Sequence, residues 1–234
     1  MATIRIDKYV SVACGITRTE AKALLKSGKI LCDGKAVVKP ETKIDDTATV
    51  MYGENRLVYK EFIYILMNKP SGILTACNDK RAKTVIDLVP DALHRNGLFP
   101  VGRLDKNTTG LLIITDDGDF GHKVISPKSN IKKRYDVELD GEVKKEYEAV
   151  FKNGIVLADG EKCLPAELII TGFSSASVII NEGKYHQIKR MFGTVGLGVN
   201  KLHRASIGRL TLPPDMPEGF CRELTDEEVA SVFE

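Results

Sequence analysis

Apolar positions along the chain fall into short runs that are separated by polar and glycine-containing stretches. Several of these runs have the length of a strand rather than a helix: residues 62–67, 111–114, 135–139, 166–170 and 177–180. The run at 135–139 alternates apolar and polar residues, which is typical of a strand with one buried face. With helices between the runs, the pattern predicts an α+β domain with a mixed, mostly antiparallel β-sheet flanked by helices.

A helix is predicted to begin near Thr17 in the N-terminal part of the chain. Thr17 and Glu20 have the spacing of a capping box, in which two side chains satisfy free backbone N–H groups of the first turn. Apolar residues follow at helical spacing: Ala21, Leu24 and Leu25. Gly28 suits the left-handed conformation at which helices often end.

A hairpin is expected directly after this helix. Residues 30–32 and 36–38 are apolar, and Asp33 and Gly34 between them suit a two-residue primed turn. Residues 50–60 contain a glycine and several charges but no clear period, so we interpret them as a linker. These features predict a small N-terminal module ahead of a larger domain.

Three basic residues of the predicted helix share one face. Arg18, Lys22 and Lys26 are spaced at i, i+4 and i+8, which places them on one side at about 100° per residue, and Lys29 follows just beyond the helix. Like charges on one face repel each other, so bound phosphates would neutralise them. A solvated surface helix is the alternative on charge alone.

Composition and charge agree with two unequal domains. A length of 234 residues accommodates a main domain and one small module, and 43% hydrophobic with 28% charged residues argue against extended disorder. The net charge of +2 is unevenly distributed, because residues 1–39 hold eight Lys or Arg and three acids, whereas residues 215–234 hold one and seven. A polyanionic partner is therefore expected to meet the N-terminal part of the chain.

Several classes of protein are not indicated by the sequence. The first residues lack the apolar stretch of a signal peptide, and no run reaches the roughly 18 apolar residues of a membrane span. The five cysteines show no C-x-x-C spacing, so they suggest neither a zinc site nor a disulfide framework. We therefore expect a cytoplasmic protein with reduced structural thiols.

Residues 102–118 are the most informative segment for chemistry. A polar loop bounded by Gly102 and Gly110 leads directly into a buried strand, which places Asp105 on a rigid scaffold while leaving it open to a ligand. Taken alone, an aspartate in such a loop is more often a turn former or a helix cap. The cluster at 116–118, Asp-Asp-Gly, is interpreted as a turn.

A second candidate, Lys189, lies on a predicted helix. An apolar stripe at i, i+3, i+4 and i+7 would anchor this helix against the sheet: Ile188, Met191, Phe192 and Val195. Lys189 would then be mounted on a rigid element. Without further information, the simpler interpretation is that Lys189 faces solvent beside Arg190. Arg190 could also reach the same position as Lys189 by geometry.

The segment 102–118 resembles the central motif of the RNA pseudouridine synthases. That motif reads G-R-L-D-x-x-T-x-G-L-L, two hydrophobic residues and T-x-D-G, and the chain matches it at each fixed position. Residues 132–137 are similar to the family's second segment, residues 182–191 to its third, and residues 68–72 to its short N-terminal motif. The resemblance extends from about residue 62 to residue 212.

About the first 50 residues resemble the S4 RNA-binding domain, which uses two short helices and a small sheet. The similar positions read R-I-D-K from Arg5, T-R-x-x-A-x-x-L-L-x-x-G-x-I from Thr17 and V-x-x-P from Val37. The resemblance implies an S4-like domain and linker over residues 1–59 and a catalytic domain over 60–234. It implies RNA contacts by basic residues of both domains: Arg5, Lys8, Arg18, Lys22, Lys26, Lys29, Arg103 and Arg190. For Arg103, a structural salt bridge remains an equal alternative.

The family resemblance implies isomerisation of a uridine without a cofactor. The bond from ribose C1′ to N1 breaks, the base turns, and C1′ joins C5 with no redox change. Asp105 would either add to the sugar or accept a ribose proton to form a glycal, and both routes stay open. Lys189 would offset the desolvation of this carboxylate. Tyr135 would stack on the uracil and move the C5 proton, whereas without the motif a packing role would be favoured.

Other side chains carry no site prediction. The histidines form no metal-ligand pattern and are interpreted as structural or RNA-contacting: His94, His122, His186 and His203. No metal or small-molecule cofactor is expected. A glycosidase-like hydrolase would need a second carboxylic acid at a defined separation, and neither Asp116 nor Asp117 is a strong candidate.

Within the family, the chain resembles the branch that modifies ribosomal RNA at a single uridine. The S4-like domain and the segments at 186–192 and 202–208 are closest to members acting on the small subunit, 16S rRNA. The expected partner is ribosomal RNA or a small-subunit assembly intermediate, bound by a monomer after base flipping. A large-subunit uridine and a non-catalytic ribosome-assembly factor remain alternatives, although the latter would be expected to lose Asp105 or its cation.

Overall fold

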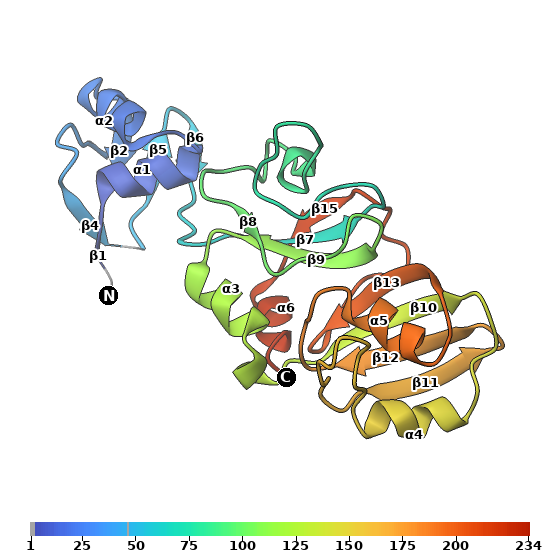
Figure 1. Cartoon of the computed structure of the whole chain (residues 1–234). Helices are drawn as coiled ribbons and strands as arrows, with labels where there is room; N and C mark the ends of the chain where they lie inside the picture. Colours follow the sequence, from blue (N-terminus) through green and yellow to red (C-terminus); the bar gives the residue numbers. More distant parts are fainter. Residues whose placement is uncertain (1–2, 46) are drawn as a thin grey trace. The chain divides into compact units, whose positions relative to one another are not determined.

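The computed structural model describes residues 3–45 and 47–234, and the chain divides into two compact units (Figure 1). The first unit runs to Ile63 and also holds His94–Gly97. The second unit comprises Tyr64–Leu93 and Leu98–Glu234. In the described residues, no helix combines the length and the apolar character that a membrane crossing requires.

The first unit combines two packed helices with small sheets. Strand β1 pairs with β4, and a separate sheet has the order β3-β2-β5-β6. The elements in chain order are β1 (Thr3–Arg5), α1 (Ile6–Cys14), α2 (Arg18–Lys26), β2 (Ile30–Cys32), β3 (Lys35–Ala36), β4 (Lys43–Asp45), β5 (Val50–Tyr52) and β6 (Asn55–Leu57). A common core joins the helices to the sheet through buried Val10, Leu25 and Ile30.

The local signals in this unit are largely confirmed. Thr17 and Glu20 form the capping box of α2, and Gly28 adopts a φ of +72° just past the helix. Asp33 and Gly34 both have positive φ, at 48° and 77°, as a primed hairpin turn requires. The second strand of this hairpin is shorter than predicted, because β3 ends at Ala36.

The linker predicted at residues 50–60 was wrong. Strands β5 and β6 form a hairpin there, with Val50 paired to Leu57, and β5 also pairs with β2. Val50 is fully buried in the core of the unit, whereas the rest of β5 and all of β6 are intermediate or exposed. Strands of three residues with one buried position are too short to produce a readable period.

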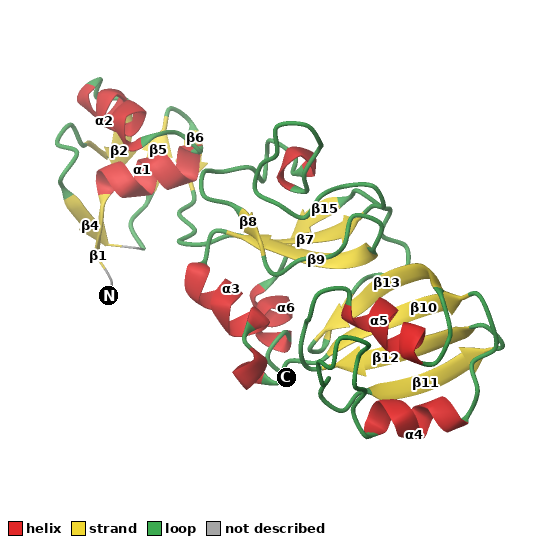
Figure 2. Cartoon of the chain, viewed as in Figure 1, coloured by secondary structure: helices red, strands yellow, loops and turns green. Residues whose placement is uncertain are grey.

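The second unit is built on one long mixed sheet, with the order β11-β12-β10-β13-β9-β7-β15 (Figure 2). Strand β14 pairs with β13, and β8 pairs with β9. The strands are β7 (Tyr64–Lys69), β8 (Phe99–Pro100), β9 (Thr109–Thr115), β10 (Lys133–Leu139), β11 (Glu167–Gly172), β12 (Ser175–Ile180), β13 (Val199–Ile207), β14 (Leu210–Thr211) and β15 (Cys221–Glu223). All these pairings are antiparallel except that of β9 with β13, which confirms the predicted α+β class and sheet.

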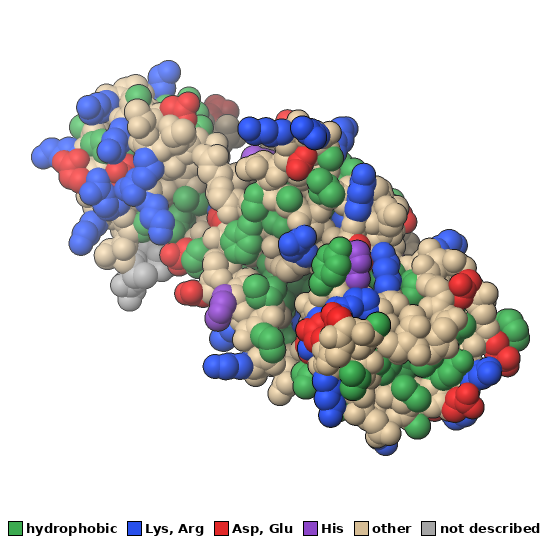
Figure 3. Space-filling model, viewed as in Figure 1, with side chains coloured by type: hydrophobic (Ala, Val, Ile, Leu, Met, Phe, Trp, Pro, Cys, Tyr) green, Lys and Arg blue, Asp and Glu red, His purple; other side chains and the backbone are tan. Residues whose placement is uncertain are grey.

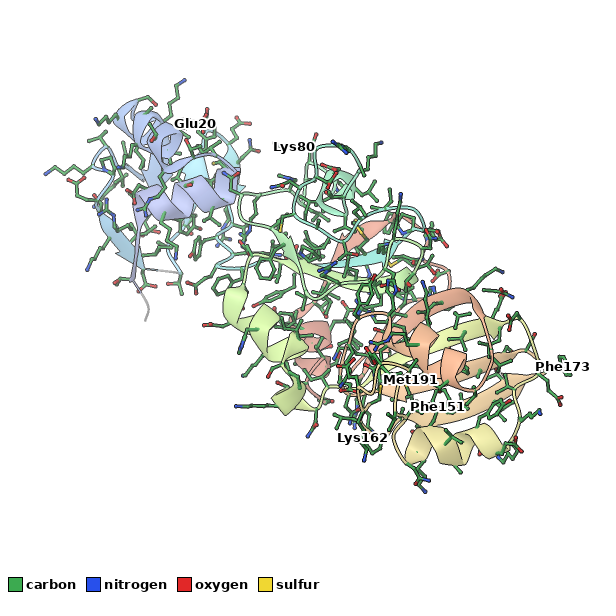
Figure 4. All side chains as sticks on the ribbon, viewed as in Figure 1. Glu20, Lys80, Phe151, Lys162, Phe173 and Met191 are labelled. Atoms are coloured by element: carbon green, nitrogen blue, oxygen red, sulfur yellow. The ribbon has the colours of Figure 1, made fainter. Side chains whose placement is uncertain are left out.

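Helices cover each half of this sheet and enclose a separate core. The core beside β10–β13 includes α4 and α5 residues, among them Phe151 and Met191, which are labelled in Figure 4. The core beside β7 and β9 includes Phe120, Val124 and Val232. The helices are α3 (Gly118–Ile125), α4 (Glu146–Lys152), α5 (Gln187–Thr194) and α6 (Asp226–Ser231), and short 3-10 helices lie at Ile86–Leu88 and Pro127–Ser129.

The cluster at 116–118 and one long strand of this unit differ from the sequence interpretation. The cluster at 116–118 is not a simple turn, because Asp117 caps α3 by accepting a hydrogen bond from the backbone N–H of Phe120 at 3.0 Å. Strand β13 was not predicted, since its residues alternate irregularly between exposed and buried positions.

The halves of the sheet meet where β9 lies parallel to β13. The register pairs Thr109 with His203 and Gly110 with Arg204. Gly110 has a φ of +105°, and a Cβ atom there would overlap the backbone carbonyl of Arg204. Glycine therefore allows the strand that follows the Asp105 loop to approach β13.

We expect Gly110→Ala to lower the free energy of unfolding by about 3 kcal/mol or more, because a methyl group would both clash and strain the backbone. Gly193→Ala is the matched control, since Gly193 lies in α5 with open space at its Cβ position. The control should be neutral or stabilising by about 0.5–1 kcal/mol. Chemical denaturation measures both, and equal stability of the two variants would contradict the assigned close approach.

Candidate active site

Asp105 lies in the loop between β8 and β9, and its carboxylate faces two nitrogen-bearing side chains. Nζ of Lys189 lies 3.2 Å from Oδ2, and Nε2 of His186 lies 3.3 Å from Oδ1. The Asp105 side chain is 26% exposed, so solvent screens these contacts only in part. The arrangement offers an anionic oxygen at an accessible position with positive charge beside it.

Helix α5 fixes the position of Lys189. The predicted apolar stripe is confirmed, because Ile188, Met191 and Phe192 are buried in the core beside the sheet. Arg190 does not face Asp105, because its guanidinium forms ion pairs with Asp159 and Glu161. The structure therefore brings Lys189, and not the neighbouring Arg190, to Asp105.

His186 was not singled out as a site residue from the sequence. It precedes α5 with a φ of +48°, and its ring stacks on exposed Tyr185 with 3.9 Å between the ring centroids. The turn before it is held by Gln187, whose side chain donates to Glu182 at 2.8 Å and accepts from the backbone N–H of Lys184. The sequence could have indicated His186 through its spacing, because it lies three residues before Lys189 and so on the same side of a helical turn.

Tyr135 and Asp105 line the same pocket. Strand β10 alternates buried and more exposed residues as predicted, and Tyr135 is 8% exposed. The pocket has a cavity volume of about 80 Å³. Apolar Ile180 and Leu202 form part of its wall, and the buried Thr108 hydroxyl in the wall has no hydrogen-bond partner among the described residues.

A fully buried lysine supports the Asp105 loop. Nζ of Lys69, at the end of β7, donates to the backbone carbonyls of Pro70 and Lys106 at 3.0 Å and of Thr108 at 2.9 Å. Lys106 and Thr108 lie one and three residues after Asp105, so this side chain ties the loop to the sheet. The sequence showed Lys69 only as part of a short motif, because a buried lysine has no periodic signal.

The basic residues predicted to bind RNA differ in their surroundings. Lys22, Lys26 and Lys29 are exposed and form no ion pair with any described residue. Arg5 and Arg18 instead share the fully buried Asp7, at 2.9 Å and 2.6 Å. Burial alone would raise the pKa of Asp7, but hydrogen bonds from Arg5 and then Arg18 bring it below its ordinary value.

The remaining basic candidates lie as follows. Nζ of Lys8 lies 3.5 Å from Glu61 and 6.0 Å from the centre of the Tyr59 ring. Arg103 is exposed and lines the Asp105 pocket. Figure 3 shows basic side chains over the visible face of the first unit. Across residues 3–45 and 47–234, no group of three or more His, Cys, Asp or Glu side chains is placed to hold a metal ion.

Comparisons with known proteins agree over the length of the chain. The family model described as RNA pseudouridylate synthase matches residues 63–194, and the S4 domain model matches residues 4–50. An uncharacterized RNA pseudouridine synthase of Bacillus subtilis is 40% identical over 97% of each chain. A ribosomal small subunit pseudouridine synthase A of Vibrio cholerae is 39% identical over 98% of this chain and 100% of that protein. A crystal structure of a pseudouridylate synthase aligns with a TM-score of 0.69 and 33% identity, covering 98% and 99% of the two chains.

The buried position of Lys69 predicts a pH dependence of stability. Burial lowers its pKa from 10.5 to about 8, although the charge of Asp105 acts in the opposite direction. Between about pH 8 and 10.5 the unfolded chain therefore holds a proton that the folded protein has released. The free energy of unfolding should rise with pH across this window, by at most about 3 kcal/mol from this residue.

Lys69→Met should remove this contribution, whereas Lys106→Met, at an exposed position, should keep it. Denaturant unfolding at closely spaced pH values gives the difference between each variant and the unaltered protein. An identical pH profile for Lys69→Met and the unaltered protein would show that Lys69 keeps its ordinary pKa.

Proposed function

We infer that this chain, which belongs to the RNA pseudouridylate synthase family, converts a uridine in RNA to pseudouridine at the Asp105 pocket. The observation that carries this proposal is the contact of Asp105 with Lys189 at 3.2 Å, in a pocket that Tyr135 also lines. A carboxylate can act on a sugar carbon or a sugar proton only in its anionic form, and an adjacent cation favours that form.

The proposed reaction uses each of these side chains. Asp105 acts on the ribose, either by adding to C1′ or by accepting a ribose proton, and the base leaves in both cases. Lys189 and His186 offset the removal of water from Asp105 when the substrate closes the pocket. Tyr135 offers an aromatic face to the uracil and a hydroxyl for proton transfer at C5. The isomerisation has no net redox change, so these residues need no cofactor for it.

We propose ribosomal RNA of the small subunit as the substrate. Relatives of Vibrio cholerae and Escherichia coli, named ribosomal small subunit pseudouridine synthase A, are 39% and 35% identical to this chain. The match to the S4 domain over residues 4–50 and the exposed Lys22, Lys26 and Lys29 support contact with structured RNA. We propose that the protein acts as a monomer in the cytoplasm on 16S rRNA or a small-subunit assembly intermediate. A non-catalytic assembly factor is disfavoured, because the charged pair at Asp105 is intact.

Asp105→Asn should abolish pseudouridine formation, because the amide keeps the shape of the side chain and loses its charge. Affinity for the same RNA should stay within a few-fold. Asp119→Asn, an equivalent change at an exposed position of α3, is the control and should be as active as the unaltered protein. Pseudouridine mapping and a filter-binding assay measure the two properties. Turnover retained by Asp105→Asn would rule out the role assigned to this carboxylate.

The exposed lysines of the first unit should determine RNA affinity. We expect the triple variant Lys22→Gln, Lys26→Gln and Lys29→Gln to bind RNA more weakly. The plot of the logarithm of its association constant against the logarithm of the salt concentration should be shallower, by up to about 0.9 for each phosphate contact that is lost. The rate at saturating RNA should change little, because none of the three lines the Asp105 pocket.

The matched control removes the same charge from exposed lysines of the second unit: Lys80, Lys144 and Lys152, each changed to Gln. Binding titrations at several salt concentrations compare the two triple variants. An equal loss of affinity in both would attribute the effect to net charge and contradict a specific role of the first unit.

A further inference from the structure

Arg204 in β13 is a buried cation with no acidic partner among residues 3–45 and 47–234. The residue is 3% exposed, and its Nε donates to the backbone carbonyl of Leu111 at 2.7 Å. Nη1 lies 3.5 Å from the hydroxyl oxygen of Tyr135, and buried Nη2 has no hydrogen-bond partner among the described residues. A buried arginine usually pairs with a carboxylate, because desolvation of its charge is otherwise costly. Because Arg204 has no such carboxylate among the described residues, a role in function is a reason for its burial.

The sheet directs Arg204 toward the active-site tyrosine. Strand β13 lies between β9 and β10, and Arg204 is in register with Gly110 on one side and Tyr135 on the other. The guanidinium carbon lies 6.0 Å from the centre of the Tyr135 ring. Its contact with Leu111 anchors the other part of the side chain to β9. Arg204 thus joins the strand after the Asp105 loop to the hydroxyl of Tyr135.

A second buried cation, Lys133, lies on the same strand as Tyr135. Lys133 lies two residues before Tyr135 on the same face of β10, and it is 9% exposed. Burial, and then the charge of Arg204, lower the pKa of Lys133 to about 8, so it carries a proton at neutral pH. Its hydrogen bond goes to the backbone carbonyl of Ile131 at 3.2 Å. A cation held beside an oxygen in a buried site, as Arg204 is beside the Tyr135 hydroxyl, stabilises negative charge that develops on that oxygen.

We propose that Arg204 is a positioning residue for the proton transfer from uracil C5, acting through the hydroxyl of Tyr135. This inference rests on the proposed function. After C1′ has joined C5, the phenolic proton of Tyr135 passes to water, and the C5–H bond then breaks as the phenolate oxygen accepts its proton. The electron pair of that bond restores the C5–C6 double bond, and N1 takes up a proton from water. Arg204 donates to the oxygen, so it directs another lone pair of that oxygen to C5 and stabilises the negative charge of the phenolate.

The test uses the full-length protein and RNA whose target uridine carries deuterium at C5. Arg204→Lys keeps the charge and loses the fork geometry, and we expect it to slow single-turnover pseudouridine formation by roughly 10-fold. Because the C5 proton step becomes slower than the other steps, the deuterium isotope effect on this rate should rise above that of the unaltered protein. A purely structural role of Arg204 would slow the reaction without changing the isotope effect, and this result would overturn the proposal.

Double variants with Tyr135→Phe separate the two residues further. Without the hydroxyl, Arg204→Lys should cause little additional slowing, because its partner atom is absent. The same 10-fold effect in both backgrounds would contradict action through Tyr135.

Arg204→Gln, which is uncharged, is the second variant, and thermal unfolding is compared for every variant. Loss of the fold in both Arg204 variants would assign the residue to structure and overturn the proposal. If the unaltered protein forms no pseudouridine in ribosomal RNA or small-subunit precursors, the proposed function itself fails, which is distinguishable from every result above.

Discussion

The contact of one carboxylate with a lysine in a partly enclosed pocket is the interaction on which the proposed chemistry of the second unit depends. Asp105 is only 26% exposed, and closure of the pocket on RNA would remove more water from it. Desolvation favours the neutral acid, which could perform neither of the steps proposed for this carboxylate. Nζ of Lys189 lies 3.2 Å from the carboxylate and opposes this effect, and Nε2 of His186 lies 3.3 Å from its other oxygen. Both come from the start of α5, so the position of one helix controls the electrostatics of the site.

Asp105 and Lys189 are anchored to different halves of the sheet. The Asp105 loop is tied to β7 by the buried Lys69, and β9 follows the loop closely against β13 because Gly110 has no side chain. Helix α5 is anchored to the other half of the sheet by Met191 and its apolar neighbours. The active site therefore depends on the junction of the two halves, where a shift of about 1 Å would change both the distance to Asp105 and the orientation of reacting groups.

The sequence predicted the features that local chemistry determines, and missed those that tertiary contacts create. The capping box at Thr17, the primed turn at Asp33 and the apolar stripe of α5 are short-range patterns, and each is present. Asp105, Tyr135 and Lys189 were predicted from motifs. In the structure Asp105 and Tyr135 line one pocket, and Lys189 contacts Asp105. The β5–β6 hairpin and β13 were missed because their burial depends on neighbouring strands rather than on a period. The contacts of His186 and Arg204 were missed because they join segments far apart in the chain.

The central claim is that a cation at position 189 keeps Asp105 functional. Single-turnover pseudouridine formation by Lys189→Met and Lys189→Arg, measured on small-subunit ribosomal RNA at saturating enzyme, tests it most directly. The account predicts that Lys189→Met slows the reaction by about 10²-fold or more, and that Lys189→Arg, which restores the charge, recovers most of the rate. Equal rates for Lys189→Met and the unaltered protein would contradict the account.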